Sequence, residues 1–327
     1  MTVAWGILST ARINRLVLAE VAGSDVARFV AVASRDVTRA TAYAAANGLQ
    51  RAYGRYDELL ADPAVDAVYV SLPNELHVPW TMRALAAGKH VLCEKPLSRD
   101  PTAVEEAFDL AEEKGLVLQE AFMYRHHPQM LRLGELVAHE AVGPVRVVRA
   151  SFSFAADEPE DRKLFTGEDG GSLMDVGCYC VNVARFLAGE PERVVGERVA
   201  NENGVDLRFV GVLRHGGGVI SYFDSGIDVP VREELEVVGS NGTIVVHDPW
   251  HHVDPLLEVR RGGDVERIRF DRGNSYRYEV ENVSRAARGQ AELLLGREDA
   301  VAQARALDAL LRSAHEGAPV ALAVAAP

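Results

Sequence analysis

Short apolar runs alternate with helical patterns over the first 122 residues. The five apolar runs that we expect to form strands are Val3–Leu8, Arg28–Ser34, Val65–Ser71, His90–Cys93 and Leu116–Ala121. The first helical pattern between them ends at Val21, and the others span Thr38–Asn47, Pro79–Ala87 and Pro101–Lys114. Strands covered on both faces are apolar almost throughout, and the β-α-β-α order is typical of parallel sheets. The pattern therefore predicts an α/β fold with a doubly wound parallel sheet.

The rhythm changes from about residue 123 onward. Helical patterns span Pro128–Val137, Leu173–Leu187, Tyr276–Arg288 and Asp299–Glu316. The strand-like segments are Val145–Phe154, Glu192–Ala200, Asp206–Arg214, Val219–Asp224, Glu234–Gly239, Thr243–Val246, Leu256–Arg261 and Glu266–Phe270. Glycine-rich hairpin breaks between several of them favour a large, mostly antiparallel open sheet with helices on one face. A symmetric partner subunit is the simplest cover for the other face, so we expect a homodimer or homotetramer.

Composition narrows the classes of function. A hydrophobic share of 48% in 327 residues is too high for a disordered chain, and the length suits two domains. The net charge of −13 argues against nucleic acid and anionic membranes as partners. Three cysteines are too few for a disulfide framework, the N-terminus has no basic leader, and no apolar run approaches the ~18 residues of a spanning helix. We therefore expect a soluble, cytoplasmic protein.

The turn after the first predicted strand is the first candidate binding element. Ser9, Ala11 and Asn14 occupy the three glycine positions of the pattern G-x-G-x-x-G. Ser9 and Ala11 are small enough for a phosphate to approach the backbone, and the hydroxyl groups of Ser9 and Thr10 could donate to it. Because no glycine of the pattern is present, an ordinary strand-to-helix turn is an equal alternative.

The end of the second predicted strand distinguishes two kinds of dinucleotide. A carboxylate there binds a ribose 2′-hydroxyl, whereas a 2′-phosphate needs arginine in its place. The sequence has Ser34 and Arg35 there, with Arg39 on the same helical face. If a dinucleotide binds, these residues favour NADP(H) over NAD(H); the alternative is that both arginines are solvated surface charges.

Lysine is scarce, because only four of the 35 basic residues are lysines. Lys95 follows the fourth predicted strand in the run Glu94-Lys95-Pro96, at the carboxyl edge where parallel sheets bind ligands. Its ammonium group could donate a hydrogen bond to a substrate oxygen or take part in proton transfer. The alternative is a lysine in a surface salt bridge.

A carboxylate and a phenol are spaced four residues apart in the second half. Asp175 and Tyr179 follow Gly170-Gly171 and share one face of the predicted helix. Such a pair can orient a substrate hydroxyl and pass a proton, although a helix-capping aspartate and a core tyrosine are the alternative. Gly177 between them allows another group to approach the helix backbone.

Taken together, the motifs resemble the Gfo/Idh/MocA oxidoreductases, a superfamily of NAD(P)-dependent sugar, cyclitol and diol dehydrogenases. The runs that carry the resemblance are Trp5–Ala11, Leu72–Asn74 with His77, Glu94–Pro96, Glu120–Arg125 with His127–Gln129, Gly171–Tyr179, Gly239 with Gly242–Thr243, and Tyr276 with Glu279. They extend over essentially the whole chain and are most similar to the D-xylose and trans-dihydrodiol dehydrogenase branch. The resemblance implies a dinucleotide-binding Rossmann domain at residues 1–122 and an α+β domain for substrate binding and oligomerisation at residues 123–327.

The resemblance also implies roles for single residues. Lys95 would contact the reacting oxygen and the nicotinamide ribose, Tyr179 would exchange the proton, and Asp175 would orient the substrate. The cofactor would be lined by Ser9, Thr10, Ala11 and Ile13 at the pyrophosphate, by Ser34, Arg35 and Arg39 at the 2′-phosphate, and by Leu72, Pro73, Asn74, His77, Glu94 and Lys95. Further candidates are Arg125 and Tyr276 on the substrate side and Arg162 on the cofactor side.

The expected function is hydride transfer between NADP(H), with NAD as the alternative cofactor, and a sugar, polyol or cyclic diol. We expect no metal, since the histidine pairs and the cysteines have poor spacing for one. Two other classes share the scaffold: a dinucleotide-sensing regulator without catalysis, and a glycosidase that keeps NAD bound.

Overall fold

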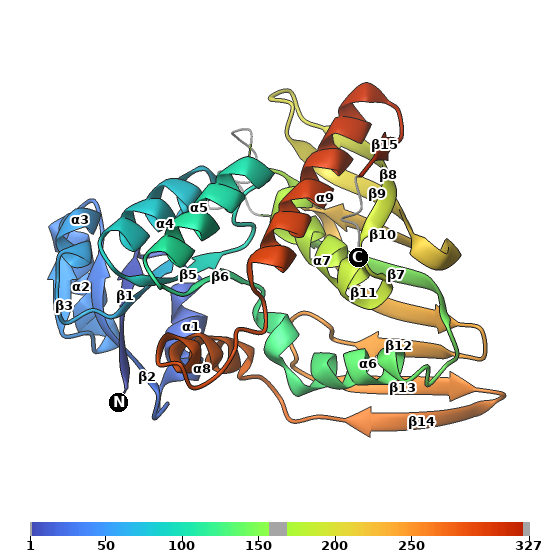
Figure 1. Ribbon diagram of the computed structural model, residues 1–327, viewed down its shortest axis with the longest axis horizontal. Coiled ribbons are helices and arrows are strands. Elements are labelled where there is room, and N and C mark those ends of the chain that lie inside the picture. The colour runs from blue at the N-terminus through green and yellow to red at the C-terminus, as the bar shows by residue number, and fades with distance from the viewer. Residues whose placement is uncertain (1, 157–168, 323–327) are drawn as a thin grey trace. The chain divides into compact units, whose positions relative to one another are not determined.

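The computed structural model describes residues 2–156 and 169–322 (Figure 1). They group into two compact units, the first formed by Met1–His126 with Asn274–Val301 and the second by His127–Gly273 with Ala302–Pro327. The sequence predicts a boundary at residue 122 between a cofactor-binding domain and a substrate-binding domain. That division of functions stays a prediction. No helix in these two ranges is both long and apolar enough to cross a membrane.

The first unit contains a six-stranded parallel sheet in the order β3-β2-β1-β4-β5-β6. Its strands are β1 (Val3–Leu8), β2 (Ala27–Ala33), β3 (Arg51–Tyr53), β4 (Ala67–Val70), β5 (His90–Glu94) and β6 (Leu118–Ala121). The predicted doubly wound sheet is confirmed, and the five predicted strands are present. Strand β3 was not predicted, since its three half-buried residues form no apolar run.

Helices cover both faces of this sheet. They are α1 (Asn14–Val21), α2 (Val37–Asn47), α3 (Tyr56–Leu60), α4 (His77–Ala86), α5 (Pro101–Glu113) and α8 (Ser275–Ala287). Helices α1, α2 and α8 share one face, where they pack on a common apolar cluster, and α4 and α5 cover the other face (Figure 1). The predicted helices of this region are confirmed, whereas the five-residue helix α3 was not predicted.

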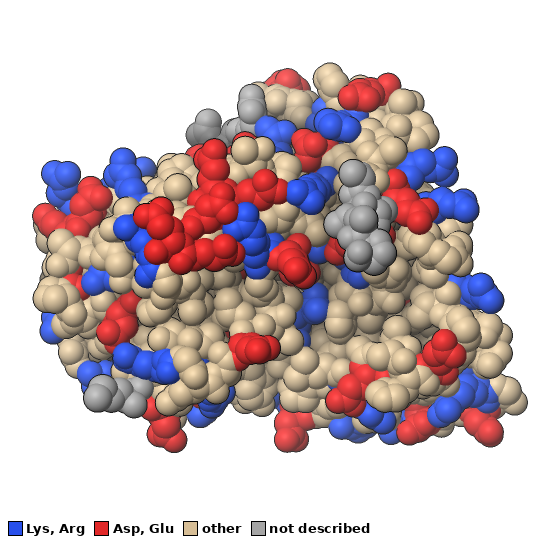
Figure 2. All heavy atoms as spheres, viewed as in Figure 1, with Lys and Arg blue, Asp and Glu red and all other residues tan. Residues whose placement is uncertain are grey.

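Helix α5 shows how local sequence builds one of these elements. The Asp100 carboxylate accepts hydrogen bonds from the backbone N–H groups of Thr102 and Ala103 at 2.9 and 3.4 Å. Its buried face consists of Val104, Ala107, Phe108 and Ala111, at helical spacing. Its exposed face carries Glu106, Asp109, Glu112 and Glu113, and acidic side chains gather over this helix in Figure 2. Part of the chain's negative charge is therefore concentrated on one helix.

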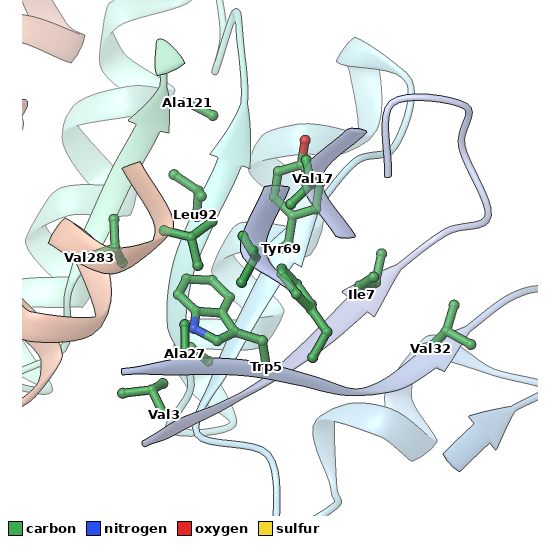
Figure 3. Close-up of a cluster of buried hydrophobic side chains, with 14 of the residues drawn as sticks. Val3, Trp5, Ile7, Val17, Ala27, Val32, Tyr69, Leu92, Ala121 and Val283 are labelled. Atoms are coloured by element: carbon green, nitrogen blue, oxygen red, sulfur yellow. The ribbon is translucent and has the colours of Figure 1, made fainter. Parts of the chain in front are cut away.

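Trp5 lies in the apolar core beneath α1 and α8. Its indole is fully buried and surrounded by aliphatic side chains of the sheet and both helices (Figure 3). The indole N–H donates a hydrogen bond to the Ser284 hydroxyl of α8 at 3.0 Å, which satisfies the one polar atom of the ring. Because of these contacts α8 belongs to the first unit, although it follows β1 by more than 250 residues.

The second unit contains a nine-stranded sheet in the order β14-β13-β12-β11-β7-β10-β9-β8-β15. Its strands are β7 (Val145–Ala155), β8 (Pro191–Ala200), β9 (Asp206–His215), β10 (Ile220–Gly226), β11 (Asp228–Gly239), β12 (Thr243–His247), β13 (Leu256–Arg261), β14 (Asp264–Arg269) and β15 (Val320–Ala321). Among the described strands of this sheet only the β10–β7 pair is parallel, so the predicted mostly antiparallel sheet is confirmed. The two-residue strand β15 was not predicted.

Two helices of this unit are α6 (Pro128–Ala138) and α7 (Cys178–Ala188), and α9 (Arg297–Glu316) joins it from residue 302 onward. The predicted helix over Leu173–Leu187 is present, but its first five residues, Leu173–Gly177, form a π-helical turn. Such turns are found frequently at functional sites. Periodicity alone does not distinguish this turn from α-helix.

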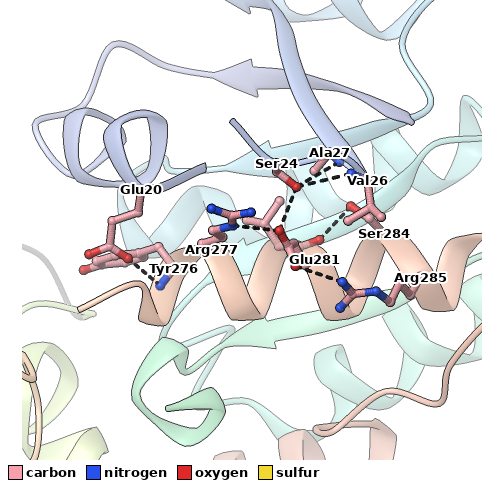
Figure 4. A network of polar contacts seen from close by, with 10 residues as sticks. Glu20, Ser24, Val26, Ala27, Tyr276, Arg277, Glu281, Ser284 and Arg285 are labelled. Atoms are coloured by element: carbon pink, nitrogen blue, oxygen red, sulfur yellow. Dashed lines mark hydrogen bonds and ion pairs between the residues drawn. The ribbon is translucent and has the colours of Figure 1, made fainter. Parts of the chain in front are cut away.

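Helix α8 also carries two carboxylates with opposite surroundings. Glu281 accepts hydrogen bonds from Ser24 at 2.8 Å and from Arg277 and Arg285 at 2.8 and 2.9 Å (Figure 4). Burial raises the pKa of Glu281, but these hydrogen bonds and charges outweigh it and lower the pKa overall. Glu279 is 1% exposed, and burial, followed by the charges of Glu94 and Glu20, raises its pKa well above the ordinary value.

We predict that Glu279→Gln changes the pH dependence of stability. A raised pKa means that the folded state keeps this proton while the unfolded chain releases it above about pH 4.5, so the wild type loses stability as pH rises toward the folded pKa. The loss is at most about 1.4 kcal/mol per pH unit for one proton. Urea unfolding between pH 4 and 8 should show the variant gaining on the wild type as pH rises.

Glu281→Gln is the matched control two residues away. Its lowered pKa predicts the opposite sign, because the charged form stabilises the fold above about pH 4.5 and this contribution is lost as pH falls. The control should therefore be less stable than the wild type at pH 7. A Glu279→Gln difference that stays constant across the pH range would contradict the prediction.

Candidate active site

Ser9 lies in the turn after β1, where a dinucleotide-binding turn has its first glycine. Its φ of 135° is one that glycine adopts far more readily than serine. The Ser9 hydroxyl donates to the backbone oxygen of Ser71 at 2.8 Å and accepts from the backbone N–H of Ala11 at 3.1 Å. The Asn14 side chain donates to the backbone oxygen of Ser9 at 3.0 Å. These bonds hold a serine in a glycine-like turn, so the residues present fit a pyrophosphate site.

The other predicted pyrophosphate contacts lie in the same turn. Thr10, Ala11 and Ile13 are all half-buried, and Ile13 directly precedes α1. Small or half-exposed side chains at these positions leave the backbone of the turn open to a ligand. All four predicted pyrophosphate contacts, Ser9 included, thus lie in one short segment.

Two exposed arginines follow β2. Ser34 is buried directly after the strand, whereas the Arg35 and Arg39 side chains are exposed. Burial raises the pKa of Tyr56, and the nearby Arg35 guanidinium opposes this effect by its charge and by a hydrogen bond. Two guanidinium groups beside a hydroxyl fit a phosphate dianion.

Asp36 between these arginines was not among the candidates. Its carboxylate accepts hydrogen bonds from the backbone N–H groups of Thr38 and Arg39 at 2.8 and 3.3 Å, which caps α2. An aspartate directly before a helical pattern is a readable N-cap signal, so the sequence could have indicated this role. The carboxylate between the two arginines is therefore engaged by backbone amides.

The segment after β4 carries Leu72, Pro73, Asn74 and His77. Asn74 begins a short 3₁₀ helix, Asn74–Leu76, and both Pro73 and Asn74 are half-buried. His77 is 1% exposed, and its Nδ1 and Nε2 lie 2.8 Å from the backbone oxygens of Pro96 and Leu72. Its imidazole thus contacts the backbone of two separate loops.

Glu94 ends β5, and Lys95 follows it directly. The Tyr69 hydroxyl of β4 donates a hydrogen bond to the Glu94 carboxylate, and burial together with the Glu94 charge raises the pKa of Tyr69 well above its ordinary value. Lys95 is half-buried and precedes a cis peptide bond to Pro96. Lys95 thus lies at the carboxyl edge of the parallel sheet, as predicted.

The two substrate-side candidates of the first unit lie in different elements. Arg125 is 8% exposed in the short helix Met123–His126. Burial, with the Arg125 charge as the second cause, lowers the pKa of His126 to about 3. Tyr276 is half-buried at the start of α8, where its backbone N–H donates to Glu20 at 3.0 Å. Their contact with a substrate stays a prediction.

Asp206 fixes the start of the segment that bears Asp175 and Tyr179. Its carboxylate, 2% exposed, accepts hydrogen bonds from the Ser172 hydroxyl at 2.7 Å and the Leu173 backbone N–H at 2.8 Å. Burial raises the pKa of Asp206, which these hydrogen bonds oppose. The capped segment enters the π-helical turn, in which Asp175 is half-buried, and α7 then carries Tyr179.

Gly177 permits the close approach that the sequence suggested. A Cβ atom at this position would lie 2.9 Å from the hydroxyl of Ser225 in β10. Because real Cβ contacts are essentially never that short, a side chain here would displace either the Ser225 hydroxyl or the π-helical turn. Glycine between the carboxylate and the phenol avoids this displacement.

Tyr179 is held by aromatic neighbours that the sequence did not reveal. Its ring centroid lies 5.3 Å from that of Phe152 and 5.8 Å from that of Trp250, both at steep angles. Trp250 is fully buried and donates from its indole to the Ser151 backbone oxygen at 3.1 Å. Tyr179 itself is 7% exposed, so packing fixes the direction of its ring. Nothing local in the sequence links residues 152, 179 and 250.

The structure thus brings the candidates together within each unit. Lys95 and the predicted cofactor contacts other than Arg162 lie in the first unit, and Asp175 and Tyr179 lie in the second. Arg162 lies outside the described residues. The proposed catalytic trio therefore stays a prediction.

The histidine pairs have structural surroundings. His127 and His252 stack with ring centroids 3.8 Å apart, and burial lowers the pKa of His252 to about 2. His127 accepts a hydrogen bond from the Gln129 backbone N–H at the start of α6. In the described part of the chain, the metal-capable group is Glu233, Asp248 and His251, with ligand atoms within 4.8 Å of one another. A 2.7 Å hydrogen bond between His251 and Glu233 accounts for part of this proximity.

Two family profiles match the chain. Residues 4–122 match the GFO/IDH/MocA oxidoreductase family with its NAD-binding Rossmann fold, and residues 130–245 match the GFO/IDH/MocA C-terminal domain.

A solved structure has a similar fold. It is the 3-ketoreductase KijD10 from Actinomadura kijaniata in complex with NADP and TDP-benzene, which superposes on this chain with a TM-score of 0.89 and 28% sequence identity. The match covers 96% of this chain and 98% of that chain.

Full-length relatives show the same likeness. The D-xylose 1-dehydrogenase (NADP(+)) 2 of Haloferax volcanii is 41% identical over 97% of this chain and 99% of its own length. The trans-1,2-dihydrobenzene-1,2-diol dehydrogenase of Xenopus laevis is 31% identical over 86% of this chain and 88% of its own. With these matches over almost its full length, the chain belongs to the GFO/IDH/MocA family of oxidoreductases.

Proposed function

We propose that the protein transfers a hydride between NADP(H) and a sugar, polyol or cyclic diol. The proposal rests on the position of Lys95, a half-buried lysine that lies directly after β5 at the carboxyl edge of a Rossmann sheet. Relatives that act on D-xylose and on a dihydrodiol, at 41% and 31% identity, support the substrate class.

The cofactor would be held mainly by residues of the first unit. Ser9, Thr10, Ala11 and Ile13 would hold the pyrophosphate, and Ser34, Arg35 and Arg39 would hold the 2′-phosphate. The remaining contacts proposed are Leu72, Pro73, Asn74, His77, Glu94 and Lys95, with Arg162 as a further one. When bound, the nicotinamide supplies the hydride chemistry.

The chain's own side chains would handle the proton and the charge. In the oxidative direction the phenolate form of Tyr179 would accept the proton of the reacting hydroxyl and become the phenol. The aromatic contacts to Phe152 and Trp250 fix the direction of its ring. Lys95 would donate a hydrogen bond to the same substrate oxygen as carbonyl character develops. Asp175 would accept a hydrogen bond from a neighbouring substrate hydroxyl, and Arg125 and Tyr276 would line the substrate.

Lys95→Ala and Tyr179→Phe should each lower kcat by about 10²–10⁴ while leaving NADP binding largely intact. Tyr179→Phe keeps the ring that packs on Phe152 and removes only the hydroxyl, so the fold should be preserved. The measurement is absorbance at 340 nm with NADP and a panel of aldoses and diols. Near-normal turnover in both variants would refute the assignment.

The same assay separates the other functional classes. Tight NADP binding without turnover of any substrate would favour a regulator. Release of sugar without net change at 340 nm would favour a glycosidase.

Arg35→Ala should weaken NADP binding by about tenfold and change NAD binding little. The reason is that the guanidinium would pair with a 2′-phosphate, which NAD lacks. Titration of both nucleotides by protein fluorescence measures this ratio. Arg55→Ala, which removes an exposed arginine paired with Asp57 at 3.9 Å, is the control. Equal losses for NADP and NAD would count against the phosphate pocket.

We also propose that the protein is a homodimer or homotetramer that associates through the nine-stranded sheet. Val210, Val212, Ile220 and Tyr222 of β9 and β10 are 41–50% exposed, and Val212 pairs with Tyr222 in register. Adjacent exposed apolar residues are typical of an interface.

We further propose that the protein is cytoplasmic. Three buried cysteines without a disulfide are consistent with this proposal.

Val212→Glu should shift the protein toward monomer, because a carboxylate would be buried without a partner in the proposed interface. Light scattering coupled to size exclusion measures the mass. Leu131→Glu, the same kind of change at a 43% exposed position of α6, should leave the mass unchanged. A wild type that runs as a monomer at all concentrations would refute this proposal.

A further inference from the structure

The turn that carries Lys95 is held from both sides by buried polar side chains. Pro96 has no backbone N–H, so its carbonyl is the only backbone group through which it can be held by hydrogen bonding. That carbonyl oxygen lies 2.8 Å from Nδ1 of His77. The backbone N–H of the next residue, Leu97, donates to the Glu120 carboxylate at 2.8 Å.

Each of these side chains is anchored to a neighbouring strand of the same sheet. His77 begins α4, and its Nε2 lies 2.8 Å from the Leu72 backbone oxygen, just past β4. Glu120 lies within β6. Strand β5, which delivers Lys95, pairs with β4 on one side and β6 on the other. The turn is therefore tied to both strands that flank β5.

Burial makes these contacts consequential. His77 and Glu120 are 1% and 3% exposed, and Pro96 and Leu97 are buried as well. A buried polar group left without its partner carries a desolvation penalty, so these hydrogen bonds stabilise the present conformation of the turn. Lys95 itself is half-buried and directly precedes the anchored residues Pro96 and Leu97, which restrict the position of its backbone.

We propose that His77, assisted by Glu120, is a positioning residue that sets the place of Lys95 through the Pro96 carbonyl. This rests on the role of Lys95 given under the proposed function. A misplacement of about 1 Å can lower the rate about 10²-fold, so loss of the His77–Pro96 contact should lower kcat while sparing cofactor affinity. This role replaces the direct cofactor contact proposed for His77 above, because both nitrogens of its imidazole face backbone oxygens.

Two substitutions separate the two contacts of the imidazole. In His77→Asn the side-chain amide nitrogen is separated from Cβ by the same number of bonds as Nδ1 of histidine, so it can still donate to the Pro96 carbonyl. In His77→Gln the amide nitrogen takes the place of Nε2, so it can donate to the Leu72 carbonyl, and the hydrogen bond to Pro96 is lost. We expect kcat to fall about 10–100-fold in His77→Gln and clearly less in His77→Asn, with the Kd for NADP within about threefold of wild type in both.

A double-mutant cycle tests whether the effect passes through Lys95. If it does, His77→Gln should lower kcat less than about twofold further in a Lys95→Ala background. Ser284→Ala removes another buried hydrogen bond of the same unit, from Trp5, and is the control for a general loss of stability. Its kcat should equal that of the wild type, and thermal unfolding checks that each variant folds.

Glu120→Leu is the second variant should His77→Gln not fold. It removes the partner of the Leu97 N–H from the other side and should lower kcat about tenfold, an effect that also disappears in the Lys95→Ala background. Independent, multiplicative losses in either double mutant would overturn the proposal. So would a His77→Gln that weakens NADP binding with unchanged kcat.

The two proposals fail in different ways. If Lys95→Ala turns over normally, the catalytic role given to Lys95 in the proposed function is wrong whatever His77 does. If Lys95→Ala is slow and His77→Gln is as active as wild type, only the positioning role is wrong.

Discussion

The first unit depends on one constraint: polar groups buried at the carboxyl edge of its parallel sheet must find partners there. Parallel strands end in the same layer, so their last backbone groups leave the ladder together and lose their strand partners. Ser9 after β1, His77 after β4 and Glu120 in β6 supply those partners by reaching across to neighbouring strands. The edge that is available to a ligand is therefore also held by side-chain hydrogen bonds between neighbouring strands.

This constraint explains how the first turn works without its glycine. A residue with a side chain at a φ of 135° is strained by about 1–3 kcal/mol. The Ser9 hydroxyl offsets part of this strain, since it bonds to the Ser71 backbone oxygen and to the Ala11 N–H. An alanine would have the strain without the bonds. The departure from the glycine pattern is thus compensated within the same turn.

Sequence patterns predicted the sheets because buried strands leave a local record, as Val3–Leu8 and His90–Glu94 do. They did not reveal the contacts that fix the site. His77 and Pro96 are 19 residues apart, and the ring of Phe152 meets Tyr179 across two elements. Helix α8 was predicted, but its packing on β1 through Ser284 was not. Such contacts depend on how strands are ordered in space, and no periodicity encodes that order.

The electrostatics of α8 follow from the same packing. Burial, and after it the charges of Glu94 and Glu20, favour the protonated form of Glu279. Glu94 in turn accepts the hydrogen bond of the Tyr69 hydroxyl. Because Glu94 directly precedes Lys95, this electrostatic influence links α8 to the residue before the proposed catalytic lysine, although the two are far apart in the sequence. That influence requires Glu279 to be deeply buried, which in turn requires α8 to pack on the sheet through Trp5.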